Sequence, residues 1–298
     1  MSAALHRSGL VFAVLGATGF SFKAILVKLA YRHGVDAETL LALRMGFALP
    51  FFLAMGVVAS RRATTALPGR DWAWMLGLGL IGYYLASYFD FLGLKYISAA
   101  LERLILYLYP TLVIVLSALF LGKPVTRRML GALGLCYIGI GIAVGHDLTI
   151  AGDAGDVVLG SLLVFASAVT FALYLMGNGE VVGRTGSARF TAYATSFACL
   201  GCLAQFFVLR PVSALVQPWE VYALALTMAL VSTVAPVWLT SEAIRRLGAG
   251  PVSLTSSLGP AITILLGWLL LDEAVGLAQF AGTVMVIGGV AVMARKRD

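Results

Sequence analysis

The sequence contains little charge for its length. Only 12% of its 298 residues are Asp, Glu, Lys or Arg, and 60% are hydrophobic, which gives a mean hydropathy of +0.96. A soluble globular domain carries about 25% charged residues. A long chain this apolar cannot hide its surface inside a water-soluble core, so it needs lipid. The shortage of charge therefore excludes a sizeable soluble domain and indicates an integral membrane protein.

Cysteine and histidine are also scarce, with three of each. Cys199 and Cys202 form a C-x-x-C pair that could suggest redox or metal chemistry, but no second Cys or His pair lies nearby to complete a site. We therefore expect them to be small packing residues. The sequence also lacks an H-E-x-x-H motif, paired intramembrane aspartates and a P-loop. No metal, no cofactor and no hydrolysis of ATP by this chain are expected.

Ten apolar segments fill most of the chain. One membrane-spanning helix takes about 20 residues, so ten spans use roughly 200 and leave about 100 for short connections. Each segment should be helical, because a span must satisfy its own backbone hydrogen bonds. The segments are 8–30, 37–58, 72–92, 98–121, 127–145, 157–177, 188–209, 219–242, 250–271 and 275–294. The first is too long for a signal-peptide core and is expected to be retained.

The basic residues lie between these segments, which argues against a nucleic-acid partner despite a net charge of +7. With the N-terminus in the cytoplasm, fourteen Lys and Arg residues fall in inside segments and three, Arg32, Lys95 and Arg210, fall outside. This distribution follows the positive-inside rule. Both termini are predicted to be cytoplasmic, in the plasma (bacterial inner) membrane. A lipid bilayer and a small-molecule solute are the expected partners; a homo-oligomer is possible, but a monomer suffices.

The two halves of the chain repeat at an offset of 150 residues. Lys95-Tyr96 falls on Arg245-Arg246, Pro110 falls on Pro260, and Gly139 falls on Gly289. Five helices per copy is an odd number, so the second copy must enter the membrane from the other side. The predicted fold is therefore an all-α membrane protein of ten transmembrane helices, built as two inverted five-helix repeats, 1–150 and 151–298. Such proteins bind solutes near the midplane between the halves.

These same stretches carry a resemblance to a known family. They run from Leu106-Tyr107-Leu108-Tyr109-Pro110 to Leu121-Gly122-Lys123-Pro124, and from Ser256-Ser257-Leu258-Gly259-Pro260 to Leu271-Asp272-Glu273. The chain resembles the EamA-type branch of the drug/metabolite transporter superfamily over its whole length. Within that superfamily it is most similar to bacterial exporters of amino acids, especially aromatic ones. The family often has an acidic residue after the fourth helix of each repeat, where this chain has Lys123 and Glu273.

Charged residues inside the spans are costly, and they usually face a cavity or a partner. Five candidates of this kind come from the first four segments, in the predicted outer half of the membrane, and together they carry one net positive charge that could meet a substrate carboxylate. They are Lys23, Arg44, Asp90, Glu102 and Arg103. The alternative is a set of structural ion pairs with side chains that reach toward the interface.

Aromatic and hydroxyl side chains supply the other candidates. Tyr83 and Ser87 share a helical face with Asp90, Tyr84 and Tyr88 lie on the neighbouring face, and Tyr107 lies at similar depth. Phenols at midplane need hydrogen-bond partners, which favours a wet cavity, although aromatic packing between helices is the alternative. In the second half the candidates are Tyr174, Trp238, Ser256 and Ser257. The alternative for the serines is that they serve only as small contacts between helices.

The sequence therefore predicts a secondary transporter that exports small metabolites, in particular amino acids including aromatic ones, by alternating access. Export of drugs, nucleosides or other metabolites is the nearest alternative. A membrane enzyme is disfavoured by the missing motifs described above. A channel is disfavoured because no repeated charged ring or filter-like loop is visible.

Overall fold

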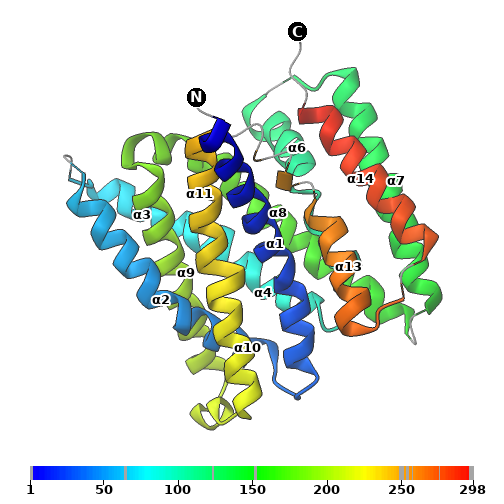
Figure 1. Ribbon diagram of the computed structural model, residues 1–298, viewed down its shortest axis with the longest axis horizontal. Helices are drawn as coiled ribbons and strands as arrows, with labels where there is room; N and C mark the ends of the chain where they lie inside the picture. Colours follow the sequence, from blue (N-terminus) through cyan, green and yellow to red (C-terminus); the bar gives the residue numbers. More distant parts are fainter. Residues whose placement is uncertain are drawn as a thin grey trace.

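The protein is a bundle of helices (Figure 1). The structure, a computed structural model, describes residues 3–63, 66–122, 124–150, 153–247, 252, 255, 256, 258–274 and 276–294. Within these residues every regular element is helical. The elements are α1 Ala3–Tyr31, α2 Ala37–Arg61, α3 Gly69–Gly79, η1 Leu80–Leu85, α4 Ala86–Gly93, α5 Ala99–Leu106, α6 Tyr109–Leu121, α7 Arg127–Ile150, α8 Ala154–Thr185, α9 Ser187–Leu209, η2 Val212–Leu215, α10 Trp219–Ala229, η3 Leu230–Val234, α11 Ala235–Leu247, α13 Gly259–Leu271 and α14 Leu277–Ala294.

Eight helical stretches in the described residues are long and apolar enough to cross a membrane, and each overlaps one of the first eight predicted segments. Two shorter apolar helices, Gly259–Leu271 and Leu277–Val292, lie within the predicted segments 250–271 and 275–294. The all-helical membrane fold is thus confirmed. Ten crossings stay a prediction, because the ninth segment lies partly outside the described residues.

Two of the long stretches are interrupted by π-helical turns at equivalent positions. The turn η1 separates α3 from α4, and η3 separates α10 from α11, 150 residues later. In η3 the cause is visible in the sequence, because Pro236 lacks the N–H that an α-helix would need there and its ring crowds the preceding turn. In η1 the equivalent residue is Ala86, so proline is not required for the π turn. Such turns are rare and frequently mark functional sites.

The helix contacts also recur with the same offset. Helix α2 packs on α9 and α7 packs on α14, while α1 lies against α11 and α13 as α8 lies against α4 and α6. At the α7–α14 contact a Cβ on Gly139 would lie 2.8 Å from the Gly282 carbonyl, and one on Gly289 would lie 2.8 Å from the Ala132 carbonyl. These are the same contact seen twice, and both require glycine. The packing supports the two-repeat interpretation.

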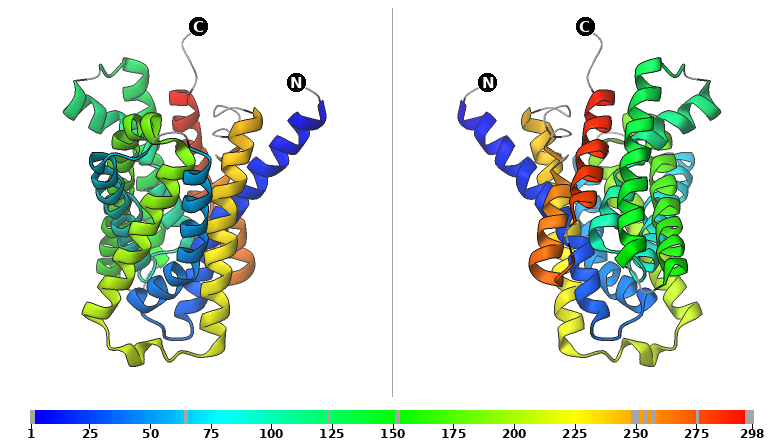
Figure 2. Two further views of the ribbon diagram at one scale, coloured as in Figure 1. Left: turned by 90° about the vertical axis from the view of Figure 1, so that its left-hand side faces the viewer. Right: turned by 90° about the vertical axis from the view of Figure 1, so that its right-hand side faces the viewer.

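The first and last helices begin and end on the same side of the bundle. The N-terminal end of α1 and the C-terminal end of α14 both lie at the top of the bundle in Figure 1 and in the two views of Figure 2. This is the arrangement that an even number of crossings produces. Which side faces the cytoplasm is indicated only by the distribution of Lys and Arg, and it stays a prediction.

Candidate functional site

A cavity of about 390 Å³ lies between the two halves of the bundle. Its walls come from α1, α2, the η1–α4 and α5–α6 stretches, α8, α9 and the η3–α11 stretch. The lining residues are Phe20, Lys23, Arg44, Met45, Phe52, Gly82, Tyr83, Ala86, Ser87, Asp90, Arg103, Leu106, Tyr107, Tyr109, Ser167, Ala168, Phe171, Thr195, Ser232, Thr233, Val237, Thr240 and Ser256. Both repeats therefore line one shared cavity.

Many wall positions occur in pairs that are 150 residues apart. The pairs are Met45 and Thr195, Gly82 and Ser232, Tyr83 and Thr233, Ser87 and Val237, Asp90 and Thr240, and Leu106 and Ser256. The backbone of the two repeats therefore presents matching positions to the cavity, while the side chains at those positions differ. The positions that line the cavity are thus related by the repeat, whereas the types of side chain at those positions are not.

The π turns bring their own residues to this wall. Gly82 lies so close to the ring of Tyr174 that no Cβ would fit between them. In the other half, the Thr233 hydroxyl donates a hydrogen bond of 3.0 Å to the Met228 carbonyl, five residues earlier. Residues of both π turns, Gly82 and Tyr83 in η1 and Ser232 and Thr233 in η3, thus line the cavity.

Three of the predicted charged residues form one buried group. Lys23 Nζ lies 2.6 Å from Asp90 Oδ2 and 3.0 Å from Glu102 Oε1. Asp90 lines the cavity, whereas Glu102 is fully buried behind it. Helices α1, α4 and α5 supply one residue each, so the group ties three elements of the first half together.

The two arginines differ from Lys23 because neither forms an ion pair among the described residues. Arg44 is 6% exposed, and its Nε donates a hydrogen bond of 3.0 Å to Thr233 Oγ1 across the two halves. Its guanidinium lies 5.3 Å from the centre of the Phe91 ring. Among the described residues, Arg44 Nη1 and Arg103 Nε have no hydrogen-bond partner. A buried cation with an unused donor beside a cavity is able to bind an anionic group.

Aromatic rings make up much of the remaining wall. Tyr83, Tyr107 and Tyr109 line the cavity with Phe20 and Phe171. Tyr109 and Phe171 meet edge to face, with their ring centres 5.4 Å apart. These rings offer an apolar surface in the same cavity as the cations, as a solute with one apolar and one charged end would need.

The structure places several predicted residues away from the lining. Tyr174 is buried behind Tyr83, with the two hydroxyl oxygens 3.4 Å apart. Tyr84 is not part of the wall, and Tyr88 donates to Glu38 instead. Trp238 is 58% exposed on the outer surface of α11 and meets Phe12 edge to face. Ser257 lies outside the described residues.

Several wall residues were missed by the sequence analysis, above all the hydroxyls Thr195, Ser232, Thr233 and Thr240. The repeat itself contained the signal that finds them. Tyr83, Ser87 and Asp90 were predicted to share a face, and adding 150 to these numbers gives Thr233, Val237 and Thr240. The same operation pairs Trp238 with Tyr88, and both lie off the cavity.

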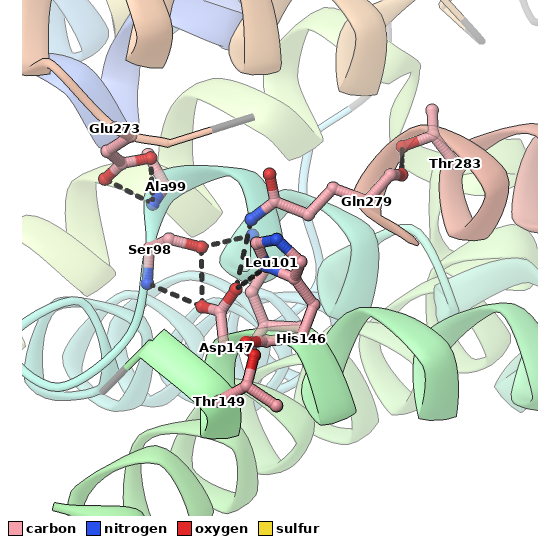
Figure 3. Close-up of polar contacts among 9 residues, drawn as sticks. All are labelled: Ser98, Ala99, Leu101, His146, Asp147, Thr149, Glu273, Gln279 and Thr283. Carbon is pink, nitrogen blue, oxygen red and sulfur yellow. Dashed lines mark hydrogen bonds and ion pairs between the residues drawn. The ribbon is translucent and has the colours of Figure 1, made fainter. Parts of the chain in front are cut away.

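A polar network joins the two halves at the end of the bundle opposite the termini. Asp147 accepts hydrogen bonds from Ser98 Oγ at 2.7 Å and from Gln279 Nε2 at 3.0 Å. Beside it, Glu273 accepts from the Ala99 backbone N–H at 2.9 Å and pairs with Lys28 at 3.1 Å. Figure 3 shows how Asp147 and Glu273 both approach the start of α5. Glu273, the acidic position that the resemblance singled out, thus caps a helix of the other repeat.

Comparison with other proteins agrees with this architecture. The chain is 29% identical to "Uncharacterized transporter YcbK" of Bacillus subtilis (strain 168), over 92% of this chain and 89% of that protein. It is 26% identical to "Pseudopaline exporter CntI" of Pseudomonas aeruginosa (strain UCBPP-PA14), over 98% of both. A protein of solved crystal structure matches 96% of both chains with a TM-score of 0.62 at 21% identity, which supports the fold alone.

The repeat found in the sequence also appears as two separate family matches. Residues 7–145 and residues 158–295 each match the EamA-like transporter family. Together with the helical membrane fold, these matches show that the chain belongs to the EamA-like transporter family.

Proposed function

We propose that this chain is a secondary transporter that exports small amphiphilic metabolites, with amino acids, including aromatic ones, as its main substrates. The transport class is that of its family and of its relatives. The solute class is argued from the cavity, whose volume of about 390 Å³ lies in the range of small-molecule sites. A membrane enzyme would need reactive groups for which neither the family nor the relatives give support.

One observation carries the solute assignment, namely the buried Arg44 beside an aromatic wall. The unused donor of Arg44 suits a carboxylate, and the rings of Tyr83, Tyr107 and Phe171 suit a planar or apolar side chain. Asp90, on the same wall, suits an ammonium group. A zwitterion with a ring meets all three requirements. A multiply charged solute would leave its extra charges unpaired against apolar rings.

Export of another metabolite is the second candidate. It is favoured by the relative from Pseudomonas aeruginosa, which is named a pseudopaline exporter. Drugs and nucleosides would use the aromatic wall but not the Arg44 donor. The choice of solute therefore depends on whether a carboxylate is required.

Alternating access follows from the proposed inversion of the halves. Inverted repeats can exchange conformations, so that the cavity opens first to one side and then to the other. The paired wall positions and the twice-repeated glycine contact support this arrangement. We place both termini in the cytoplasm, and we place the protein in the plasma membrane.

The solute is tested with purified protein in liposomes and three matched probes: L-phenylalanine, phenethylamine and 3-phenylpropionate. We expect counterflow of labelled phenylalanine to be the fastest, because only this probe offers both the ammonium and the carboxylate. Equal rates for phenylalanine and phenethylamine would contradict the carboxylate site. No counterflow of phenylalanine, with rapid movement of nucleosides or organic cations, would replace the amino-acid assignment.

The orientation is tested with single cysteines in intact cells. Asp153 and Ser187 begin neighbouring helices, and both side chains are exposed. An impermeant thiol reagent should label Asp153→Cys in intact cells and Ser187→Cys only after lysis. The reverse pattern would place the termini outside the cell.

A further inference from the structure

The group formed by Lys23, Asp90 and Glu102 contains one more carboxylate than it can pair. Lys23 Nζ approaches both acids, at 2.6 Å and 3.0 Å. Asp90 is 2% exposed and Glu102 is fully buried, so water does not compensate either charge. Two ionised carboxylates and one ammonium would leave a net negative charge in a low-dielectric site, which is costly.

The unused oxygens of these two acids show where a proton would help. Among the described residues, Asp90 Oδ1 and Glu102 Oε2 have no hydrogen-bond partner, and the one partner of Glu102 Oε1 is the Lys23 ammonium at 3.0 Å. Their shared contact with Lys23 Nζ brings the two carboxyl groups together around one ammonium. Two ionised carboxylates have no hydrogen to share, whereas one proton between them supplies the missing donor and removes the excess charge.

Other charged or titratable groups face this site from the surrounding helices. Arg44 of α2 and Tyr31 of α1 lie close enough to Asp90 to interact electrostatically, and Arg103 of α5 does so with Glu102. The cations favour ionised acids, so they make release of the proton feasible. Glu242, by contrast, pairs with Arg245 and Arg246 near the end of α11 and lies off the cavity.

We infer that Asp90 and Glu102 form the proton site of a proton-coupled antiporter. This inference rests on the transport activity proposed above. With the cavity open to the outside, one proton from external water bonds to a carboxylate oxygen of the pair. With the cavity open to the cytoplasm, that O–H bond breaks and the proton passes to water.

The exchange follows from competition at Asp90. When the pair is deprotonated, Asp90 can hold the ammonium group of a solute whose carboxylate lies on Arg44. When the pair holds a proton, the attraction for the ammonium is lost. Solute and proton therefore exclude one another, so each reorientation carries one or the other. Binding of the proton lowers the affinity for the solute, and binding of the solute lowers the affinity for the proton by the same factor, as antiport requires.

The transport test uses liposomes containing the full chain, with the membrane potential clamped at zero and the lumen one pH unit more acidic than the medium. For exchange of one proton against one L-phenylalanine, the probe should accumulate about tenfold inside, because one pH unit and a tenfold gradient are equal in free energy. Glu102→Gln should abolish accumulation but retain phenylalanine counterflow at equal pH. The matched control, Glu242→Gln, should accumulate the probe as the unmodified chain does.

Counterflow without accumulation in the unmodified chain would overturn the proton site and leave the proposed function standing. Absence of counterflow would overturn the amino-acid assignment instead. Infrared spectroscopy of the purified protein then decides the proton site without any solute. We expect a carboxylic-acid C=O band at neutral pH that is lost in Glu102→Gln and in Asp90→Asn but kept in Glu242→Gln. A spectrum without this band, or a band unchanged in both site variants, would refute the inference.

Discussion

The two repeats share their backbone and differ in their charge. The π turns η1 and η3 occupy equivalent positions, and the fourth helical segment of each repeat contains a proline in the first turn of its second part, Pro110 or Pro260. Those helices end at Gly122 and Asp272, which adopt left-handed backbone with φ of 61° and 59°. The two repeats therefore agree in local backbone conformation as well as in their overall hydrophobic pattern.

Charge follows no such symmetry. At the equivalent positions in the second half, the five charged candidates of the first half are replaced by uncharged residues. Lys23, Arg44, Asp90, Glu102 and Arg103 correspond to Leu173, Ala194, Thr240, Val252 and Ser253. Both repeats bring matching positions to the cavity, and its charged side chains come from the first half. Replacing a charged residue of the first half by the residue at the equivalent position of the second half therefore tests the role of the charge, with little change in the helix packing.

Lys23→Leu should have the largest effect, because it leaves two buried acids without their cation. Breaking a buried ion pair typically costs 3–5 kcal/mol, and we expect about 3 kcal/mol here because the acids can take up protons. Thermal unfolding of the purified protein measures the loss, which should shrink as the pH falls. The triple variant Lys23→Leu/Asp90→Thr/Glu102→Val should recover most of the stability. A triple variant less stable than Lys23→Leu would show that the acids are held by other partners.

Arg44→Ala should have the second largest effect. It gives the first repeat the residue type that the second repeat has at the equivalent position, Ala194. Losing a hydrogen bond to a charged group costs about 1.5–3 kcal/mol, so the half-saturating phenylalanine concentration should rise roughly 10- to 100-fold. Phenethylamine, which has no carboxylate, should be affected less. Proteoliposome uptake measures both, with Arg184→Ala as the control, because Arg184 pairs with Asp71 away from the cavity. Equal losses for both probes would favour a purely structural role for Arg44.

Tyr83→Thr should have a smaller effect, confined to the apolar part of the solute. The exchange removes one ring from the wall, and aromatic contacts contribute about 0.5–1.5 kcal/mol beyond simple burial. The half-saturating concentration should rise up to about tenfold for phenylalanine and remain nearly constant for alanine. Tyr137→Phe on α7 lies off this cavity and serves as the control. An equal rise for alanine would place the ring away from the solute side chain.

Gly122→Asp, which gives the first repeat the cap residue of the second, should have the smallest effect. Nothing lies within 4 Å of a Cβ at this position, so only the left-handed backbone opposes a side chain. An ordinary L-residue loses about 1–2 kcal/mol in this conformation, and Asp loses less. Thermal unfolding should therefore rank the unmodified chain above Gly122→Asp, and Gly122→Asp above Gly122→Ala. The opposite order of the two variants would point to a charge effect near the membrane surface.

Hydrophobic runs were sufficient to predict the helices, because each span must be apolar and internally hydrogen-bonded. The spacing of Tyr83, Ser87 and Asp90 also predicted their common wall correctly. Trp238 was predicted to line the cavity because it is aromatic and lies near the middle of its segment. The direction of its side chain depends on the π turn η3 that precedes α11, and the side chain lies on the outer surface. The partners of Lys23 could not be predicted, because Asp90 and Glu102 reach it from helices whose relative rotation is set only by packing.

The π turns also determine how the length of this chain can change. A π turn holds one residue more than an α-helical turn, and each helical residue corresponds to a rotation of about 100°. Deleting one residue from Leu80–Leu85 would therefore restore a regular turn with α3 and α4 still in register, so Asp90 would keep its direction toward Lys23. Deleting two residues would exceed what the wide turn absorbs, and it would rotate Asp90 about 100° away from Lys23. The chain length at these turns can therefore change by one residue during evolution without dismantling the charged group.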